Sequence, residues 1–375
     1  MSPISRRLLQ GATHIPGRVA NDWRSKVDFI PISGTIAFGF TPVVGTRAAF
    51  ESQWGAVTNI VRIYDQGKIA GTENSLLAIT GGSQDALNAG LVPVLDHNLS
   101  QMLGNAGFNM IDMNGTGMSC WAWVAAGNYN ADGVGPTGRP YQGLDSWADA
   151  IKALSSGTCP TNRIMFTLCH EFESITEGGG DGTNRAGSPA EFATMYRYVW
   201  NRFKTRGAAN IRWGMNFAGA TTNLGTSLND SGSDGYYPGH LYVDWLGWDP
   251  YNAAGIRDNT WRSFENINNK FGELDWWHTN FSVGGNATGT GIIYKPVMIC
   301  EFGTVDSYTD AQSASYNALT WFDDMITYLS TAGNADIFRW LLYYNDANMN
   351  LLSAGSYRMQ GSTNRGKATV WAKIN

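Results

Sequence analysis

The chain has 375 residues and a formal net charge of −5 at pH 7, with 26 Lys and Arg against 31 Asp and Glu. This balance lacks the basic surface that nucleic-acid binding requires, and no apolar run reaches the roughly 18 residues of a membrane span, so we expect neither a nucleic-acid partner nor membrane insertion. Hydrophobic residues make up 43% of the chain and aromatic residues 13%, which predicts a folded, aromatic-rich globular protein.

Short apolar runs rich in β-branched residues recur along the chain and alternate with helical patterns and Gly-rich connections. Such alternation is typical of parallel βα units. The predicted strands are 34–40, 58–64, 91–96, 163–170, 211–216, 242–249, 296–301 and 337–343. Their order predicts an α/β fold, a (β/α)₈ TIM barrel with long βα loops. We expect residues 1–30 to form an N-terminal arm packed on the barrel and residues 31–375 to form one catalytic domain.

Two helices between these strands carry clear signals. The run Ser188-Pro189-Ala190-Glu191 combines an N-cap, a proline at the first helical position and a capping-box glutamate, and Gly207 ends the pattern. A second helix is predicted over 311–331 and a last one near 364–373. Between the strands, four stretches without periodicity are predicted to be loops: 104–143, 173–187, 218–240 and 272–294.

The four cysteines lack the C-x-x-C spacing of zinc or redox sites. We expect free buried thiols, although a bridge between Cys120 and Cys159 stays open at this point. The pair His170-Glu171 does not continue as the His-Glu-x-x-His of zinc proteases, because the fifth residue is Ser174. The sequence therefore predicts no metal and no cofactor.

Two of the predicted strands end in a glutamate, about 130 residues apart. Glu171 follows the strand 163–170 directly, and Glu301 ends the strand 296–301 before Phe302-Gly303. In a parallel barrel, both would lie at the carboxyl ends of the strands, where active sites are built. Glycoside hydrolysis needs such a pair, with one carboxyl protonated and the other ionised. An exposed acid at a strand end is the alternative for each.

Further polar residues stand at other predicted strand ends. Asp249, Tyr251 and Asn252 follow the strand 242–249, and a phenol at that position can orient a neighbouring carboxylate. Candidates to line a sugar site stand at the ends of three more strands: Arg62, Asp65, Asp96, His97, Asn98 and Asn216. Solvated loop residues are the alternative for these, and Trp213 and Trp248 are expected in the core.

Together these segments resemble glycoside hydrolase family 26, which belongs to a clan of retaining (β/α)₈ glycosidases. The resemblance extends over about residues 163–345. It rests on the following motifs: His170-Glu171, Tyr237-Pro238-Gly239, Asp244-Trp245-Leu246-Gly247, Tyr251-Asn252, Pro296 to Glu301-Phe302-Gly303, and Trp340.

The resemblance implies a role for each matching residue. Glu171 would be the acid/base and Glu301 the nucleophile. His170 would lie beside the acid/base, Tyr251 would donate a hydrogen bond to the nucleophile, and Trp340 would form the floor under the sugar. We add Asn216, Asp249 and His97 as substrate-binding or orienting residues.

The chain departs from the family after His170-Glu171. Family mannanases continue with Met-Asn-Gly and a nearby Trp, whereas this chain continues with Phe172-Glu173-Ser174. The departure leaves the substrate open between β-mannan and a related β-glycan. Glu173 is a rival for the acid role, but the pairing with His170 favours Glu171.

We therefore expect a retaining glycoside hydrolase that cleaves internal β-glycosidic bonds of a polysaccharide by double displacement. Two alternatives remain open: a phage-associated hydrolase of a bacterial capsule or cell-wall glycan, and a non-catalytic carbohydrate-binding barrel. Arg6-Arg7 resembles the start of a twin-arginine export signal, but residues 11–24 are too polar for its apolar core. We expect action outside the cell without a signal peptide, with delivery in a virion as one route.

Overall fold

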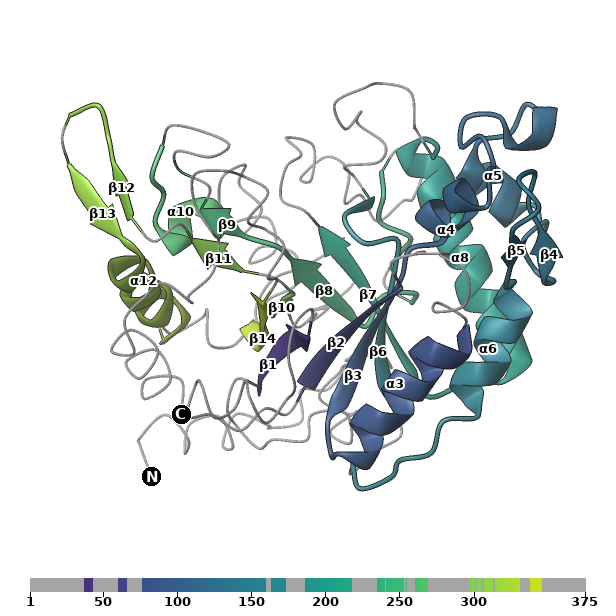
Figure 1. Cartoon of the computed structure of the whole chain (residues 1–375), viewed down its shortest axis with the longest axis horizontal. Coiled ribbons are helices and arrows are strands. Elements are labelled where there is room, and N and C mark those ends of the chain that lie inside the picture. Colours follow the sequence, from purple (N-terminus) through teal and green to yellow (C-terminus); the bar gives the residue numbers. More distant parts are fainter. Residues whose placement is uncertain are drawn as a thin grey trace, which may run out of the picture. The chain divides into compact units, whose positions relative to one another are not determined.

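The structure of the protein is a computed structural model. It describes residues 37–42, 60–65, 76–159, 163–172, 186–217, 235–239, 241–252, 254, 260–268, 297–300, 302–304, 307–312, 314–330 and 338–345. The chain divides into two compact units. We call Ile63–Leu246 the central unit, and Met1–Arg62 together with Gly247–Asn375 the terminal unit. Figure 1 shows the elements of each.

The central unit is built on a parallel sheet. Strands β3 (Val92–His97), β6 (Ile164–Leu168) and β7 (Ile211–Phe217) pair in the order β3-β6-β7, with Val94 opposite Met165. Every residue of these three strands is buried, as is usual for parallel strands covered on both faces. Because the strands are parallel, the residues that follow them emerge at one edge of the sheet.

The helices of the central unit cover this sheet. They are α3 (Leu76–Asn88), α4 (Leu99–Asn105), the 3₁₀ helix η3 (Met113–Gly115), α5 (Cys120–Ala125), α6 (Leu144–Lys152) and α8 (Pro189–Arg206); a hairpin joins β4 (Gly133–Val134) to β5 (Pro140–Tyr141). In Figure 1, α3, α6 and α8 lie side by side along the strands. Within the described part of the chain, no helix combines the length and apolar character needed to cross a bilayer.

Helix α8 begins and ends as the sequence predicts. The backbone N–H of Ser188 donates to Glu191 Oε2 at 2.6 Å, and the N–H of Glu191 donates to Ser188 Oγ at 3.3 Å, which completes the capping box. Gly207 ends the helix with φ of 83°, a left-handed conformation that glycine adopts at little cost. The buried face of the helix consists of Phe192, Ala193, Met195, Tyr196, Val199 and Phe203.

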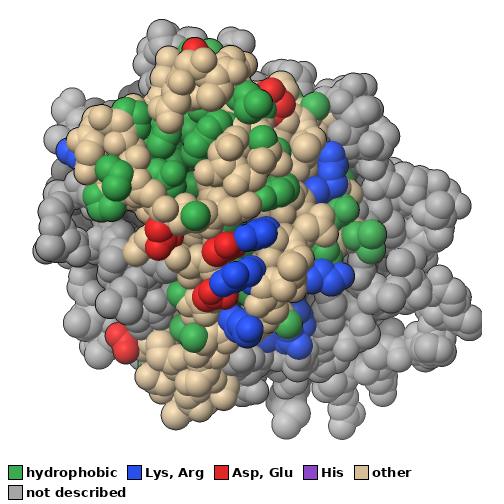
Figure 2. All heavy atoms as spheres, turned by 90° about the vertical axis from the view of Figure 1, so that its right-hand side faces the viewer, with side chains coloured by type: hydrophobic (Ala, Val, Ile, Leu, Met, Phe, Trp, Pro, Cys, Tyr) green, Lys and Arg blue, Asp and Glu red, His purple; other side chains and the backbone are tan. Residues whose placement is uncertain are grey.

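Ion pairs join the exposed sides of α6 and α8. Arg202 donates two hydrogen bonds to Asp145, one to each carboxylate oxygen, both at 2.6 Å. One turn further along α8, Arg206 pairs with Asp149. Figure 2 shows basic and acidic side chains side by side on this face of the molecule. The bonds from Arg202 hold the pKa of Asp145 below its ordinary value of 3.8.

We predict that Asp145→Asn lowers the free energy of unfolding by about 1 kcal/mol at pH 7, because a bidentate pair is stronger than most surface pairs. A carboxylate with a lowered pKa in the folded state stabilises the fold above its unfolded pKa and loses that contribution as the pH falls through the folded pKa. The difference between wild type and variant should therefore shrink as the pH falls below the unfolded pKa of about 3.9. Denaturant unfolding at pH 7 and pH 2.5 measures it.

The exposed Asp85 of α3 offers a matched control, since Asp85→Asn removes a surface charge of the same sign. We expect this control to differ little from wild type at either pH. Equal losses for Asp85→Asn and Asp145→Asn at pH 7, or an undiminished loss for Asp145→Asn at pH 2.5, would contradict the assignment.

The terminal unit is also built on parallel strands. Strands β1 (Ala37–Pro42), β14 (Phe338–Asn345) and β10 (Val297–Ile299) pair in the order β1-β14-β10, and β2 (Ile60–Asp65) pairs with β1 on its other side. Strand β8 (Trp245–Trp248) continues the chain from one unit into the other. Buried residues of this unit include Met298, Phe302 and Trp321.

Shorter elements follow the carboxyl ends of β8 and β10. They are β9 (Tyr251–Asn252), which pairs with β11 (Gly303–Thr304); the hairpin of β12 (Ser307–Thr309) and β13 (Ser315–Asn317); and the helices α10 (Phe264–Asn268) and α12 (Ala318–Ser330). The β9–β11 pairing fixes the two connecting segments to each other immediately after the strands.

Each of the eight predicted strand segments overlaps an observed strand, namely β1, β2, β3, β6, β7, β8, β10 and β14. The start of the predicted helix 311–331 is wrong: α12 begins at Ala318, because residues 315–317 pair with β12 instead. The predicted loop 104–143 contains α5 and the β4–β5 hairpin, which are too short to show a periodic pattern. The expected arm 1–30 and the helix near 364–373 lie outside the described residues.

Candidate functional site

The residues after β6 are tied to both neighbouring strands. The N–H of Cys169 donates to the carbonyl of His97 at 2.9 Å, and the N–H of Glu171 donates to the carbonyl of Asn216 at 3.2 Å. Both Cys169 (φ 58°) and Glu171 (φ 49°) adopt the left-handed conformation, which costs a non-glycine residue on the order of 1 kcal/mol. The hydrogen bonds to β3 and β7 hold this strained turn, which fixes the direction of the Glu171 side chain.

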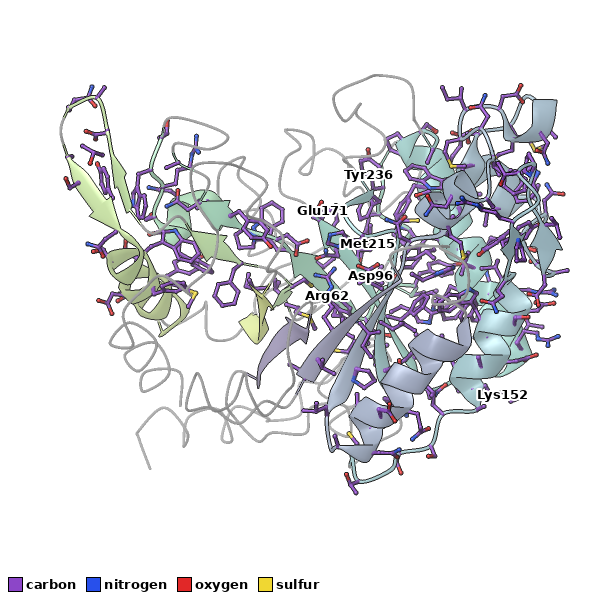
Figure 3. All side chains as sticks on the ribbon, in the orientation of Figure 1. Arg62, Asp96, Lys152, Glu171, Met215 and Tyr236 are labelled. Carbon is purple, nitrogen blue, oxygen red and sulfur yellow. The ribbon has the colours of Figure 1, made fainter. Side chains whose placement is uncertain are left out.

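His170 is the centre of a polar cluster at this edge of the sheet. Its Nδ1 lies 3.2 Å from Asp96 Oδ2 and 2.9 Å from Asn216 Nδ2, and its Nε2 lies 3.8 Å from Glu171 Oε2. We call Asp96, His170, Glu171 and Asn216 the His170 cluster. They come from the ends of β3, β6 and β7, so the sheet order brings together residues far apart in the sequence (Figure 3).

Exposure within the His170 cluster increases from Asp96 to Glu171. The side chain of Asp96 is 1% exposed, that of His170 20% and that of Glu171 31%. Nδ1 of His170 contacts both the buried Asp96 carboxylate and the Asn216 amide nitrogen, and its tautomer decides with which of the two it forms a hydrogen bond. Because Nδ1 is held on this side, Nε2 is turned toward Glu171, the most exposed member of the cluster.

The thiol beside this cluster, that of Cys169, is buried, which disfavours its thiolate form. Burial raises the pKa of Cys169 to about 12, and the negative charge of Asp96 adds to the effect. Burial likewise raises the pKa of Cys120, with a contribution from Cys169. All four cysteines are free and buried, which confirms the free thiols expected from the sequence and not the bridge between Cys120 and Cys159.

Aromatic side chains support the turn that carries Glu171. The next residue, Phe172, is fully buried and stacks on Phe192 of α8 with ring centroids 4.2 Å apart. It also packs against Phe217 at 4.9 Å and Tyr236 at 5.0 Å. Phe172 thus anchors the chain immediately after Glu171. It is also the first residue at which this chain departs from the family 26 pattern, which has Met at this position.

The terminal unit holds a buried charge pair. Arg62 of β2 lies 3.7 Å from Asp249, and both side chains are fully buried. Arg62 Nη1 also donates to the carbonyl of Cys300 at 3.1 Å, and the N–H of Cys300 donates to the carbonyl of Trp248 at 2.8 Å. These bonds fix the backbone immediately before position 301. Glu301 itself lies outside the described residues, as does Glu173.

The other predicted site residues have separate environments. Tyr251 lies in β9, half-buried, and Asn252 beside it is buried and accepts a hydrogen bond from the N–H of Arg262 at 3.3 Å. Trp340 lies in β14, opposite Ala37 of β1; only its backbone is among the described parts of the chain.

His97, which the sequence suggested as a substrate-binding or orienting residue, packs among buried aromatic side chains. Its ring is fully buried, with its centroid 4.0 Å from that of Trp147 in α6, and it packs against Phe166 and Tyr129. Asp96 and His97 are adjacent in β3, so their side chains point to opposite faces of the sheet. Asp96 therefore joins the His170 cluster, whereas His97 faces the helix.

Sequence reasoning identified Arg62 and Asp96 only as weak candidates, with solvated loop residues as the alternative. Both are buried and paired. Both are charged residues inside an otherwise apolar strand, and this signal could have identified them as stronger candidates. A charged side chain buried in such a strand needs a partner of opposite charge or a hydrogen-bonding group. Trp213 and Trp248 are buried in the core, as predicted.

No family model matches the chain. Among curated proteins, endoglucanase H of Acetivibrio thermocellus is 26% identical over 157 residues, which are 38% of this chain and 15% of that protein. The chain thus spans about one seventh of the length of this relative.

Solved structures resemble the chain over most of its length. A GH26 β-mannanase from Bacteroides ovatus is 14% identical and has a TM-score of 0.50, with 90% of this chain and 87% of that chain covered. GH26C from a Muricauda species is 12% identical and has a TM-score of 0.54, with 92% and 87% covered. The chain therefore shares the fold of these GH26 structures, which confirms at the level of fold the resemblance seen in the sequence.

We predict that Cys169 resists alkylation in the folded protein. At pH 8, a thiol with a pKa of about 12 is ionised in only about one molecule in ten thousand, and burial excludes the reagent as well. Iodoacetamide followed by mass spectrometry should modify Cys169 only after unfolding in guanidinium chloride. Rapid modification of Cys169 in the folded protein would contradict its placement.

Proposed function

We propose that this protein is a glycoside hydrolase that cleaves internal β-glycosidic bonds of a polysaccharide. The single observation that carries the proposal is the His170 cluster: a partly exposed carboxylate at the end of a buried parallel strand, beside a histidine that a buried aspartate orients. The shared fold with GH26 structures supports it, as does the sequence match to an endoglucanase.

The reaction we propose is a double displacement. Glu301 attacks the anomeric carbon, and the glycosidic bond to the leaving group breaks while Glu171 donates its proton to the departing oxygen. Glu171 then removes a proton from water, which attacks the same carbon and releases Glu301. This route requires the two carboxyl groups to lie about 5.5 Å apart.

Each unit supplies supporting groups for one half of this reaction. Asn216 and Asp96 hold His170, and the ring in turn limits where the Glu171 carboxyl lies. Arg62 and Asp249 fix the carbonyl of Cys300, one residue before Glu301. We propose that Tyr251 donates a hydrogen bond to Glu301 and that Trp340 forms the floor under the sugar.

We also propose that the eight parallel strands form one (β/α)₈ barrel within a single catalytic domain over residues 31–375. The strand orders within the two units support this, because both are those of parallel strands that follow one another around a barrel. For the substrate we propose β-mannan or a related β-glycan. The similar structure from Bacteroides ovatus is described as a β-mannanase and the sequence relative as an endoglucanase.

The test is a reducing-sugar assay on a panel of β-mannan, β-glucan and β-galactan with wild type, Glu171→Gln and Glu301→Gln. We expect each variant to lose about a thousandfold in turnover, because each removes a group that takes part in bond cleavage. Glu265→Gln in α10 is the matched control, since this side chain is exposed, and it should keep full activity.

Azide separates the two roles. It should rescue Glu301→Ala with an inverted glycosyl azide and Glu171→Ala with a retained one, because only in the first does azide replace the nucleophile. A wild type that releases no sugar from any glycan, or a Glu171→Gln variant with more than half of the wild-type rate, would overturn the proposal.

Asp96 should behave as a positioning residue. We predict that Asp96→Asn lowers kcat by about tenfold to a hundredfold with little change in KM, since Asp96 is buried and acts through His170. The loss should shrink on aryl glycosides with a good leaving group such as dinitrophenolate, whose departure needs no proton. An equal loss on all substrates would indicate a structural role only, and a thermal melt of each variant controls for folding.

A further inference from the structure

Two aromatic rings of the terminal unit stack on each other outside the fully buried residues of that unit. Trp261, between β9 and α10, lies over Tyr316 of β13 with ring centroids 5.3 Å apart and planes 14° apart. Both side chains are partly exposed. Most large aromatic side chains pack in the core. A flat aromatic stack that keeps part of its surface in solvent is therefore a candidate ligand-binding surface.

Hydrogen bonds restrain the Tyr316 half of the stack. Asp310 closes the hairpin: its Oδ1 accepts from the N–H of Gln312 at 3.0 Å and of Ala314 at 2.8 Å. Its Oδ2 accepts from the hydroxyl of Tyr316 at 3.2 Å. This bond restrains the hydroxyl end of Tyr316 relative to the hairpin.

The Trp261 half is tied to β9 and α10. The next residue, Arg262, donates its N–H to Asn252 Oδ1 of β9 at 3.3 Å. Phe264, at the start of α10, is fully buried against Trp321 of α12. The segment that follows Trp261 is thus anchored to β9 and to α12.

The stack also lies on the connections that leave the carboxyl ends of two barrel strands. Residue 261 follows β8 and β9, and residue 316 follows β10 and β11. Because β9 and β11 pair, with Tyr251 opposite Gly303, these connections run together beyond the strands. In parallel α/β proteins, ligands bind on the side where such connections emerge.

We propose that Trp261 and Tyr316 form a platform on which one sugar ring of a β-linked glycan stacks, remote from the bond that is cleaved. This inference rests on the proposed function and names part of its binding surface. Flat, rigid aromatic faces bind pyranose rings through their axial C–H groups at a small cost in conformational entropy.

The experiment compares substrates of different length. Trp261→Ala should raise KM for the polysaccharide that wild type cleaves by about fivefold, with kcat unchanged, the size expected for one lost stacking contact. The same variant should leave kcat/KM for a short aryl glycoside unchanged, because that substrate does not reach the platform. Trp261→Phe keeps an aromatic face and should lie between wild type and Trp261→Ala.

Trp200 provides a matched control. It is a partly exposed tryptophan of α8 that packs on Tyr242 and lies under Lys204, and Trp200→Ala should not change the ratio of polymer to short-substrate activity. Trp261→Leu replaces Trp261→Ala if the latter does not fold, since leucine fills space without a flat face. Melting temperatures are recorded for all variants.

The outcomes separate the platform from the proposed function. An unchanged KM for polymer, an equal loss on long and short substrates, or an equal effect of Trp200→Ala would overturn the platform. If wild type cleaves no substrate, the proposed function fails. Affinity electrophoresis in gels containing β-mannan or β-glucan then tests the platform alone: retardation that Trp261→Ala abolishes supports it, and no retardation of wild type overturns it.

Discussion

The contact between the Asp96 carboxylate and Nδ1 of His170 constrains the whole candidate site. A carboxylate that is 1% exposed has lost its water and must be paired, so β3 and the turn after β6 have to remain in register. That requirement keeps the left-handed turn at Cys169 and Glu171 in place despite its strain. It also determines which nitrogen of His170 faces Glu171.

In the terminal unit, too, a buried charged side chain restrains the backbone of another strand. Arg62 and Asp249 are both fully buried, and removing one partner of such a pair typically costs about 3–5 kcal/mol because the other charge is left without compensation. The guanidinium also binds the carbonyl of Cys300, so the pair restrains the strand end that precedes Glu301. In both units, a buried charge on one strand therefore fixes the backbone at the end of another.

Local sequence patterns accounted for much of the fold. The eight apolar runs became strands, and the capping box with its terminal glycine marked α8 at both ends, because these signals depend on residues close together in the chain. Short elements were harder. The first residues of the predicted helix 311–331 pair as β13 with β12, and α5 has only six residues, too few for a period to appear.

The sequence by itself determined the alternation of strands and helices, the net charge of −5, and the glutamates that end two strands. Only the tertiary structure decided which polar residues cooperate. Asp96 and His97 are neighbours in one strand, yet the alternation of side chains sends Asp96 to His170 and His97 to Trp147. These contacts join residues at least 50 positions apart, and they depend on sheet order and register, which a local pattern does not encode.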